Sequence, residues 1–180
     1  MDAPLIVELS ALRKAAVLSD EASAFYPSSA WHTRSVTSQT SSHEARAVRA
    51  VVETFKVPRG HTPRALLGAK FRPGPGGEVT AEVGSSRDPW NAPKNCTSRL
   101  WMHPFRAGLP EDYVRAVLEG LADPLLPPGV VTVDRAGHDD ANSSPEAFGE
   151  AARLLALVLR TLMADGHVEA VVRDAMGSWA

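Results

Sequence analysis

Residues 137–148, GHDDANSSPEAF, decide the fold of this chain. They form a short polar turn followed by an Ala/Leu-rich segment, in which apolar side chains recur at spacings of three and four and predict a helix over 145–163. If Ser143 is the N-cap of this helix, Glu146 completes a capping box. If Ser144 is the N-cap, the proline after it takes its favoured first helical position. Both alternatives predict a helix start that is held by side-chain hydrogen bonds.

The segments before this turn predict the rest of a sheet-and-helix domain. Residues 110–121 combine a proline start, acidic residues in the first turn and an apolar stripe, which together predict a helix. The turn PGPGG predicts an antiparallel hairpin between the two strands that flank it. The order strand, strand, strand, helix, strand, helix is α+β, and we expect a mostly antiparallel four-stranded sheet with helices on one face. The expected strands are 47–57, 66–72, 78–83 and 130–133.

The flanking segments predict additions to this domain. Apolar residues at spacings of three and four predict a helix over 4–19 and another over 166–176. Residues 27–42 are rich in Ser and Thr and predict a linker, and residues 84–108 predict a long excursion whose aromatics cover the core edge or face a partner. We therefore expect three parts, which are an N-terminal helix and linker (1–42), the main domain (43–164) and a C-terminal helical extension (165–180).

Composition narrows the class of protein. The chain has 180 residues and a formal net charge of −2, which argues against a basic footprint for nucleic acid along the whole chain, although a local arginine patch remains compatible with it. The single cysteine, Cys96, excludes an internal disulfide and a multi-cysteine zinc site. No signal peptide and no apolar run of about 20 residues is visible, so we expect a cytoplasmic protein without a membrane partner.

Three blocks of residues 66–160 resemble the fourth domain of translation elongation factor G and the related domains of elongation factor 2 and the tetracycline ribosome-protection proteins. Residues 108–121 are similar to the family's Pro-x-x-Tyr-hydrophobic-x-Ala-Val-x-x-Gly helix, and residues 130–133 to its central strand. Residues 139–148, DDANSSPEAF, are similar to its His-Asp-Val-Asp-Ser-Ser-x-x-Ala-Phe loop and helix start. The resemblance implies the two-layer fold named after the second domain of ribosomal protein S5.

The resemblance also implies a contact surface. In the full factor the loops of this domain form a tip that enters the decoding region of the ribosome. The same loop here offers five side chains as tip contacts, and the segment that replaces the family's glycine-rich loop offers His61 and Arg64. No Gly-x-x-x-x-Gly-Lys-Ser/Thr motif occurs, so the chain has no GTPase signature of its own. The five tip-loop candidates are His138, Asp139, Asp140, Asn142 and Ser143.

The aromatic residues of the excursion suggest a second contact surface. Trp90 and Trp101, interleaved with cations such as Arg99, are typical of a surface that stacks on bases and contacts phosphates. The alternative is an apolar loop that folds over the sheet. We expect no cofactor and no metal, because the acidic turn has neither the calcium-loop pattern nor a zinc signature.

These observations favour a non-enzymatic binding module that contacts the ribosome or RNA through residues 137–144. Two alternatives remain open. One is an enzyme of unknown reaction in which His138 and Asp134 or Asp140 perform acid–base chemistry in a pocket. The other is an oligomeric scaffold, or a module for a protein partner, in which the terminal helices supply the interface.

Overall fold

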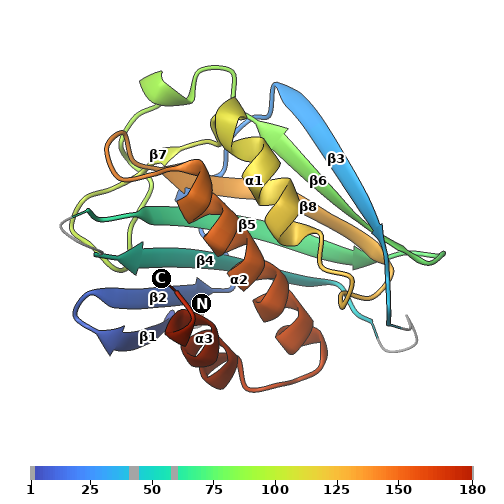
Figure 1. Ribbon diagram of the computed structural model, residues 1–180. Helices are drawn as coiled ribbons and strands as arrows, with labels where there is room; N and C mark the ends of the chain where they lie inside the picture. The colour runs from blue at the N-terminus through green and yellow to red at the C-terminus, as the bar shows by residue number, and fades with distance from the viewer. Residues whose placement is uncertain (1–2, 41–44, 58–60, 180) are drawn as a thin grey trace.

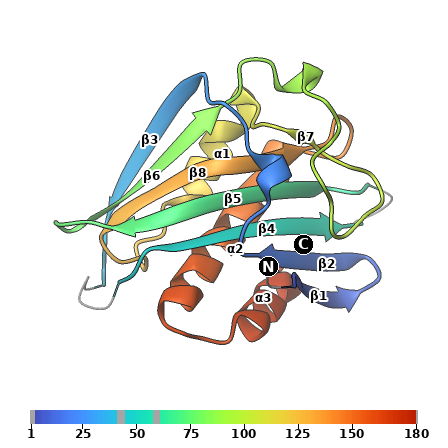
Figure 2. The ribbon, with the colours of Figure 1, turned by 180° about the vertical axis from the view of Figure 1, so that it is seen from behind.

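The computed structural model describes residues 3–40, 45–57 and 61–179, and within them it shows one mixed sheet with helices on a single face (Figure 1). The class is α+β, as expected. A loop-rich segment covers part of the other face (Figure 2). The strands are β1 (Leu5–Ser10), β2 (Arg13–Leu18), β3 (Ala30–Thr37), β4 (Val48–Lys56), β5 (Arg64–Pro73), β6 (Glu78–Ser85), β7 (Arg106–Ala107) and β8 (Gly129–His138). The helices are α1 (Glu111–Leu121), α2 (Pro145–Met163) and α3 (Val168–Gly177).

The sheet is larger than the four strands expected. In its described part eight strands take part, in the order β1-β2-β4-β5-β8-β6-β3, with β7 paired to β8. The pair β6 and β8 is parallel, whereas β8 runs antiparallel to β5. Strand β8 therefore lies in the middle of the sheet, which positions the polar loop that follows it.

The expected hairpin between the second and third predicted strands is wrong in its pairing. The chain does turn between β5 and β6, but β8 is inserted between them, so that Pro73 and Val79 both align with Gly129. A Cβ atom at Gly129 would lie 2.4 Å from the carbonyl oxygen of Arg72, so the close approach of the inserted strand requires glycine there.

The connection from β6 through α1 to β8 crosses over with a left hand. In Figure 1 the helices face the viewer, β6 runs toward the upper left and β8 lies below it. Such crossovers are rare in parallel βαβ units, because the twist of the strands favours a right-handed path. This connection differs from a compact βαβ unit, because the long excursion 84–108 lies between β6 and α1.

Helix positions agree closely with the sequence. The helices predicted over 110–121, 145–163 and 166–176 are α1, α2 and α3. Ser144, and not Ser143, is the N-cap of α2, because its Oγ accepts a hydrogen bond from the backbone N–H of Ala147 at 3.2 Å. Helices α1 and α2 pack on each other and on the sheet, where Phe71 and Phe148 are fully buried in the main core.

The N-terminal predictions are wrong. The predicted helix over 4–19 is the antiparallel hairpin β1–β2, which adds to the sheet through β4. The predicted linker over 27–42 contains β3, an edge strand paired to β6, and its last two residues lie outside the described part. The three strands of segment 1–42 therefore belong to the same sheet as the main domain.

The excursion 84–108 forms a second, smaller core on the face of the sheet away from the helices. Cys96 and Phe105 pair with each other through their backbones and pack with Val51 and Leu66. Beneath this layer Glu53 is buried, and its carboxylate accepts hydrogen bonds from the Ser98 hydroxyl and the Arg99 amide. Part of the excursion therefore folds over the sheet, which was one of the two alternatives for its aromatic residues.

Candidate functional site

Two connections at one end of the sheet meet side by side. One precedes β5 and the other joins β8 to α2, and we call their described residues 61–63 and 139–144 the tip loops. The amide of Arg64 donates to the carbonyl of Asn142 at 2.8 Å. In return, the hydroxyl of Ser143 donates to the carbonyl of Arg64 at 2.8 Å. These reciprocal bonds join the two segments that the sequence proposed separately as contact sites.

The loop 139–144 is held by its own side chains. Oδ1 of Asp139 accepts from the amides of Ala141 and Asn142 at 3.0 and 3.2 Å and from the Asn142 side-chain amide at 3.2 Å. The Asp139 amide in turn donates to the Ser143 hydroxyl at 2.9 Å. Asp139, Asn142 and Ser143 therefore shape the loop, as Asx turns do, and its backbone is ordered before any partner arrives.

A shallow hollow of ≈ 210 Å³ lies between the tip loops. It is open to solvent and it sits at the N-terminus of α2, where the helix dipole favours negative charge. The hollow brings His61 of the tip loop 61–63 together with Asn142 and Ser143 of the tip loop 139–144. Its lining consists of His61, Thr62, Pro63, Ala141, Asn142, Ser143 and Ser144.

Asp140 connects the tip loop 139–144 to the excursion 84–108. Its carboxylate accepts from Nε of Arg106 at 2.7 Å and lies 3.0 Å from Nζ of Lys94. The Arg106 hydrogen bond, followed by that of Lys94, lowers the pKa of Asp140 to about 2. Asp140 is therefore ionised at neutral pH and neutralised by two cations, so it presents no free negative charge to a partner.

His138 lies beneath the tip and not on it. Strand β8 extends as far as this residue, and the side chain is fully buried (0 % exposed). Its Nδ1 bonds the carbonyl oxygen of Gly108 at 3.1 Å and therefore carries the proton, because a carbonyl can only accept. The Trp90 ring stands edge-on to the imidazole at 4.9 Å between centroids. Burial lowers the pKa of His138, so the imidazole is neutral at pH 7.

Arg64 is buried as well, although the sequence offered it as a loop contact. Its guanidinium lies 3.6 Å from the centroid of the Phe105 ring and donates to the carbonyl of His103 at 2.7 Å. Its Nε is 3.9 Å from Oδ2 of Asp139. Burial lowers the pKa of Arg64, whereas the charge of Glu53 raises it. Arg64 therefore supports the tip loops from below. No sequence pattern indicated this burial.

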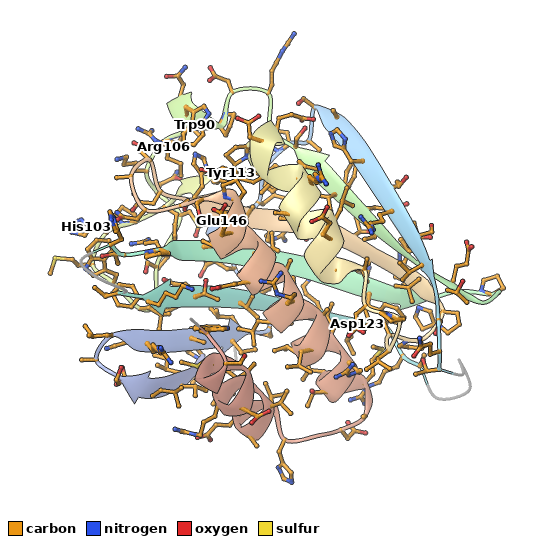
Figure 3. The ribbon with its side chains drawn as sticks, in the orientation of Figure 1. Trp90, His103, Arg106, Tyr113, Asp123 and Glu146 are labelled. Carbon is orange, nitrogen blue, oxygen red and sulfur yellow. The ribbon has the colours of Figure 1, made fainter. Side chains whose placement is uncertain are left out.

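The proposed stacking residues have different neighbours. Trp90 is 44 % exposed and contacts Tyr113 and His138 above the start of α1. Trp101 is half-buried beside Phe55 and His103. Figure 3 shows Trp90 and His103 at separate positions along the excursion. Arg99 is exposed at the surface and bonds the carboxylate of Glu21 at 2.8 Å.

The chemistry available at the tip is recognition by hydrogen bonds and charge. Among the described residues no group of three or more His, Cys, Asp or Glu side chains is placed to hold a metal ion. The hollow between the tip loops is not lined by His138. The carboxylate of Asp134 is bound by Arg49, with Nη2 to Oδ2 at 2.6 Å. The sequence offered Asp134 or Asp140 as the acid–base partner of His138. Both carboxylates are bound instead by arginine or lysine side chains.

The chain matches no known protein family, no curated protein and no solved structure. In the part of the chain that the structure describes, no helix has the length and apolar character that crossing a membrane requires.

Proposed function

We propose that this protein is a non-enzymatic RNA-binding module related to the fourth domain of elongation factor G, and that the tip loops contact RNA such as that of the ribosome. The observation that carries the proposal is the meeting of residues 61–63 and 139–144 around one open hollow. The two segments are far apart in sequence. The resemblance indicates 139–144 by similarity and 61–63 only by its place, where the family has a glycine-rich loop. Their reciprocal hydrogen bonds make them one surface.

The arrangement of the elements supports the relationship. Apart from the two-residue strand β7, the segment from β4 to α2 contains three strands, a helix, a strand and a helix in the order expected for the ribosomal protein S5 domain 2-like fold. In this proposal β1, β2 and β3 are additions to that core, and α3 covers the β1–β2 hairpin. The polar hollow at the start of α2 suits a phosphate oxygen, because the positive end of the helix dipole lies there.

The chemistry of the exposed groups supports a contact with RNA. His61 is exposed beside the hollow, and Lys94, Arg99 and His103 are exposed on the neighbouring excursion. Partly exposed Trp101 offers a ring beside His103. Phosphates would contact the cations and an unstacked base would contact the ring, the combination that single-stranded RNA requires.

The test is co-sedimentation with ribosomes and fluorescence anisotropy with a labelled single-stranded RNA, both at low and at high salt. We expect association that weakens as salt rises, because phosphate contacts release counterions. His61→Glu should weaken it further by placing a negative charge in the hollow. The matched control is His167→Glu, which makes the same charge change at the exposed start of α3.

The proposal is wrong if the protein fails to bind both ribosomes and RNA at low salt. It is equally wrong if His167→Glu weakens binding as much as His61→Glu does, because the attraction would then depend on net charge and not on the tip.

A further inference from the structure

Among the described residues, no strand pairs with the outer edge of β3. Its pairing with β6 continues without a register shift from Ala30 to Thr37, and the strand contains neither lysine nor proline. Proteins usually protect an exposed edge with a bulge, a charge or a covering element, since its free N–H and C=O groups pair with other chains.

The opposite edge, β1, shows such protection. Its pairing with β2 is irregular between Glu8 and Ser10, and α3 packs against it. Arg173 on α3 donates to the backbone carbonyl of Glu8 at 3.4 Å, and the Glu8 side chain pairs with Lys14 at 2.9 Å. One edge of the sheet therefore has an irregular register and a helix packed against it, whereas no described strand pairs with the other edge.

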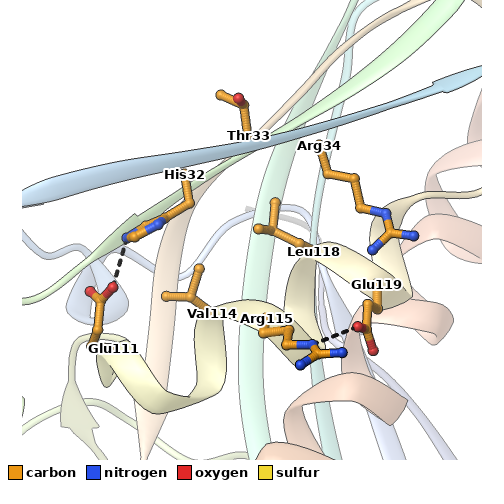
Figure 4. A pocket seen from close by; sticks show the side chains of 8 residues that line it. All are labelled: His32, Thr33, Arg34, Glu111, Val114, Arg115, Leu118 and Glu119. Atoms are coloured by element: carbon orange, nitrogen blue, oxygen red, sulfur yellow. Dashed lines mark hydrogen bonds and ion pairs between the residues drawn. The ribbon is translucent and has the colours of Figure 1, made fainter.

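The free edge of β3 borders a groove of ≈ 390 Å³ along α1. Figure 4 shows His32 and Arg34 of β3 facing Glu111, Arg115 and Glu119 of α1, with Val114 and Leu118 between them. The groove therefore combines an apolar wall with polar side chains on both sides. The lining residues are His32, Thr33, Arg34, Glu111, Val114, Arg115, Leu118 and Glu119.

The carboxylates of the groove already have partners within the protein. Glu111 lies 2.9 Å from Nε2 of His32, and Glu119 lies 2.9 Å from Nε of Arg115. Among the described residues Arg34 forms no ion pair within 4.0 Å, although its charge helps to lower the pKa of Glu119. Arg34 is thus the cation on this edge that is placed to meet an incoming carboxylate.

The backbone groups that point outward can be assigned. The amide of Ser38 donates to the carbonyl of Gly77 at 2.8 Å, and these residues continue the register of β3 with β6. Hydrogen-bonded and non-bonded pairs alternate in an antiparallel ladder. The even-numbered residues of β3 therefore bond β6, and the odd-numbered ones, Trp31, Thr33 and Ser35, direct their N–H and C=O groups to the free edge.

A second copy of this chain fits the edge poorly. Directly opposed residues of antiparallel strands lie on the same face of the sheet. In self-pairing of β3, the two registers that use nearly the whole strand place Arg34 opposite either Arg34 or His32. Both put cationic or potentially cationic side chains against each other, which destabilises the pair.

We propose that the β3 edge and the α1 groove bind an extended acidic segment of a partner protein, which adds to the sheet as a further strand and places a carboxylate opposite Arg34. The backbone of Trp31, Thr33 and Ser35 supplies the ladder bonds, and Val114 and Leu118 contact the segment's aliphatic side chains, as in β-augmentation. This surface lies apart from the tip loops and does not depend on their proposed role.

The experiment measures binding of a capped probe peptide, Glu-Thr-Val-Thr-Glu-Thr-Val, by titration calorimetry, with the same peptide carrying lysine for glutamate as its counterpart. In an extended conformation its Glu and Val side chains lie on one face, so that a carboxylate opposite Arg34 and an aliphatic side chain can enter the groove together. We expect the glutamate peptide to bind more tightly, and Arg34→Glu to weaken it by about tenfold. Thr33→Pro removes an outward N–H without removing a bond to β6. It should weaken binding by roughly tenfold or more, whereas Thr33→Ala, which keeps the N–H, should bind as the unaltered protein does.

Circular dichroism of Thr33→Pro checks that the sheet is intact, and Arg34→Glu tests the same surface without a backbone change. The proposal is overturned if the acidic peptide does not bind, or if it binds the Thr33→Pro and Arg34→Glu variants as tightly as it binds the unaltered protein. Light scattering that detects a dimer abolished by Thr33→Pro would also overturn it, because the occupant would then be a second copy.

Discussion

At the scale of single residues, Arg64 and His138 show how the tip loops are supported. Both were proposed as contact residues, and both are fully buried beneath the surface. Arg64 reaches the carbonyl of His103 and the ring of Phe105, and His138 reaches the carbonyl of Gly108. Their polar groups thus join the tip to the excursion 84–108.

Replacing Arg64 by methionine should destabilise the fold. The change leaves Glu53 buried without the charge that offsets it and removes a hydrogen bond, so we expect a loss of ~3 kcal/mol in the free energy of unfolding. The matched control is Arg72→Met, at the exposed end of the same strand, which should change stability by less than ~0.5 kcal/mol. Urea denaturation measures both. If Arg64→Met lowers the free energy of unfolding by no more than ~0.5 kcal/mol, as expected for Arg72→Met, the structural role of Arg64 is contradicted.

His138 should make stability depend on pH. Its pKa in the folded state lies below the ordinary value of 6.5, so the unfolded chain binds the proton more readily. Stability should therefore fall as pH drops from about 6.5 toward that lowered pKa, by at most ~1.4 kcal/mol per pH unit. His138→Gln, which retains a donor for Gly108, should lose this dependence in denaturation between pH 5 and 7. His167→Gln, at an exposed position, should retain it, and an unchanged slope in both variants would contradict the assignment.

At the scale of elements, the sequence was sufficient where local patterns agreed with the fold. The strands and helices predicted between residues 47 and 163 follow from alternation, caps and turn residues, and the structure contains each of them. The strand predicted over 130–133 is longer, since β8 extends from Gly129 to His138, and the two-residue strand β7 was not predicted. The hairpin of β5 and β6 was wrong, because the insertion of β8 between them is a non-local event that a turn sequence cannot reveal.

The N-terminal errors have the same origin. In the predicted helix 4–19 the helical spacing depended on Leu9 and Leu12, and both side chains are largely exposed in the β1–β2 hairpin. Pairing with β4 determines the conformation there, so tertiary structure overrides local spacing. β3 was predicted as linker because most of its residues are exposed on both faces, which leaves no alternation to detect.

The contact between α1 and α2 provides a prediction at this scale. A Cβ atom on Gly120 would lie 2.6 Å from Cβ of Ala152 and 2.7 Å from the carbonyl oxygen of Gly149. Gly120→Ala should therefore force the helices apart and destabilise the protein by ~1–3 kcal/mol. A Cβ atom on Gly149 would have its nearest neighbour, Cβ of Ala116, at an ordinary contact distance of 3.6 Å. Because alanine has a higher helix propensity than glycine, Gly149→Ala should leave stability unchanged or raise it by up to ~1 kcal/mol. Thermal unfolding of both variants decides, and a stabilised Gly120→Ala would contradict this packing.

At the scale of the whole molecule, one sheet separates two kinds of structure. Helices α1, α2 and α3 cover one face, and part of the excursion covers the other (Figures 1 and 2). The tip loops lie at one end of the sheet, where β4, β5 and β8 meet α2, and the free edge lies along β3. The two surfaces proposed for partners are therefore separate, so a variant can alter one of them without the other.

The most direct test of the tip as the contact surface is a heteronuclear NMR titration of the protein with single-stranded RNA at low salt. The account predicts that the largest amide shifts fall on residues 61–64 and 139–144 and weaken when salt is added, while the amides of β3 remain unchanged. Shifts that leave both tip loops unaffected, or the absence of any shift at saturating RNA, would contradict it.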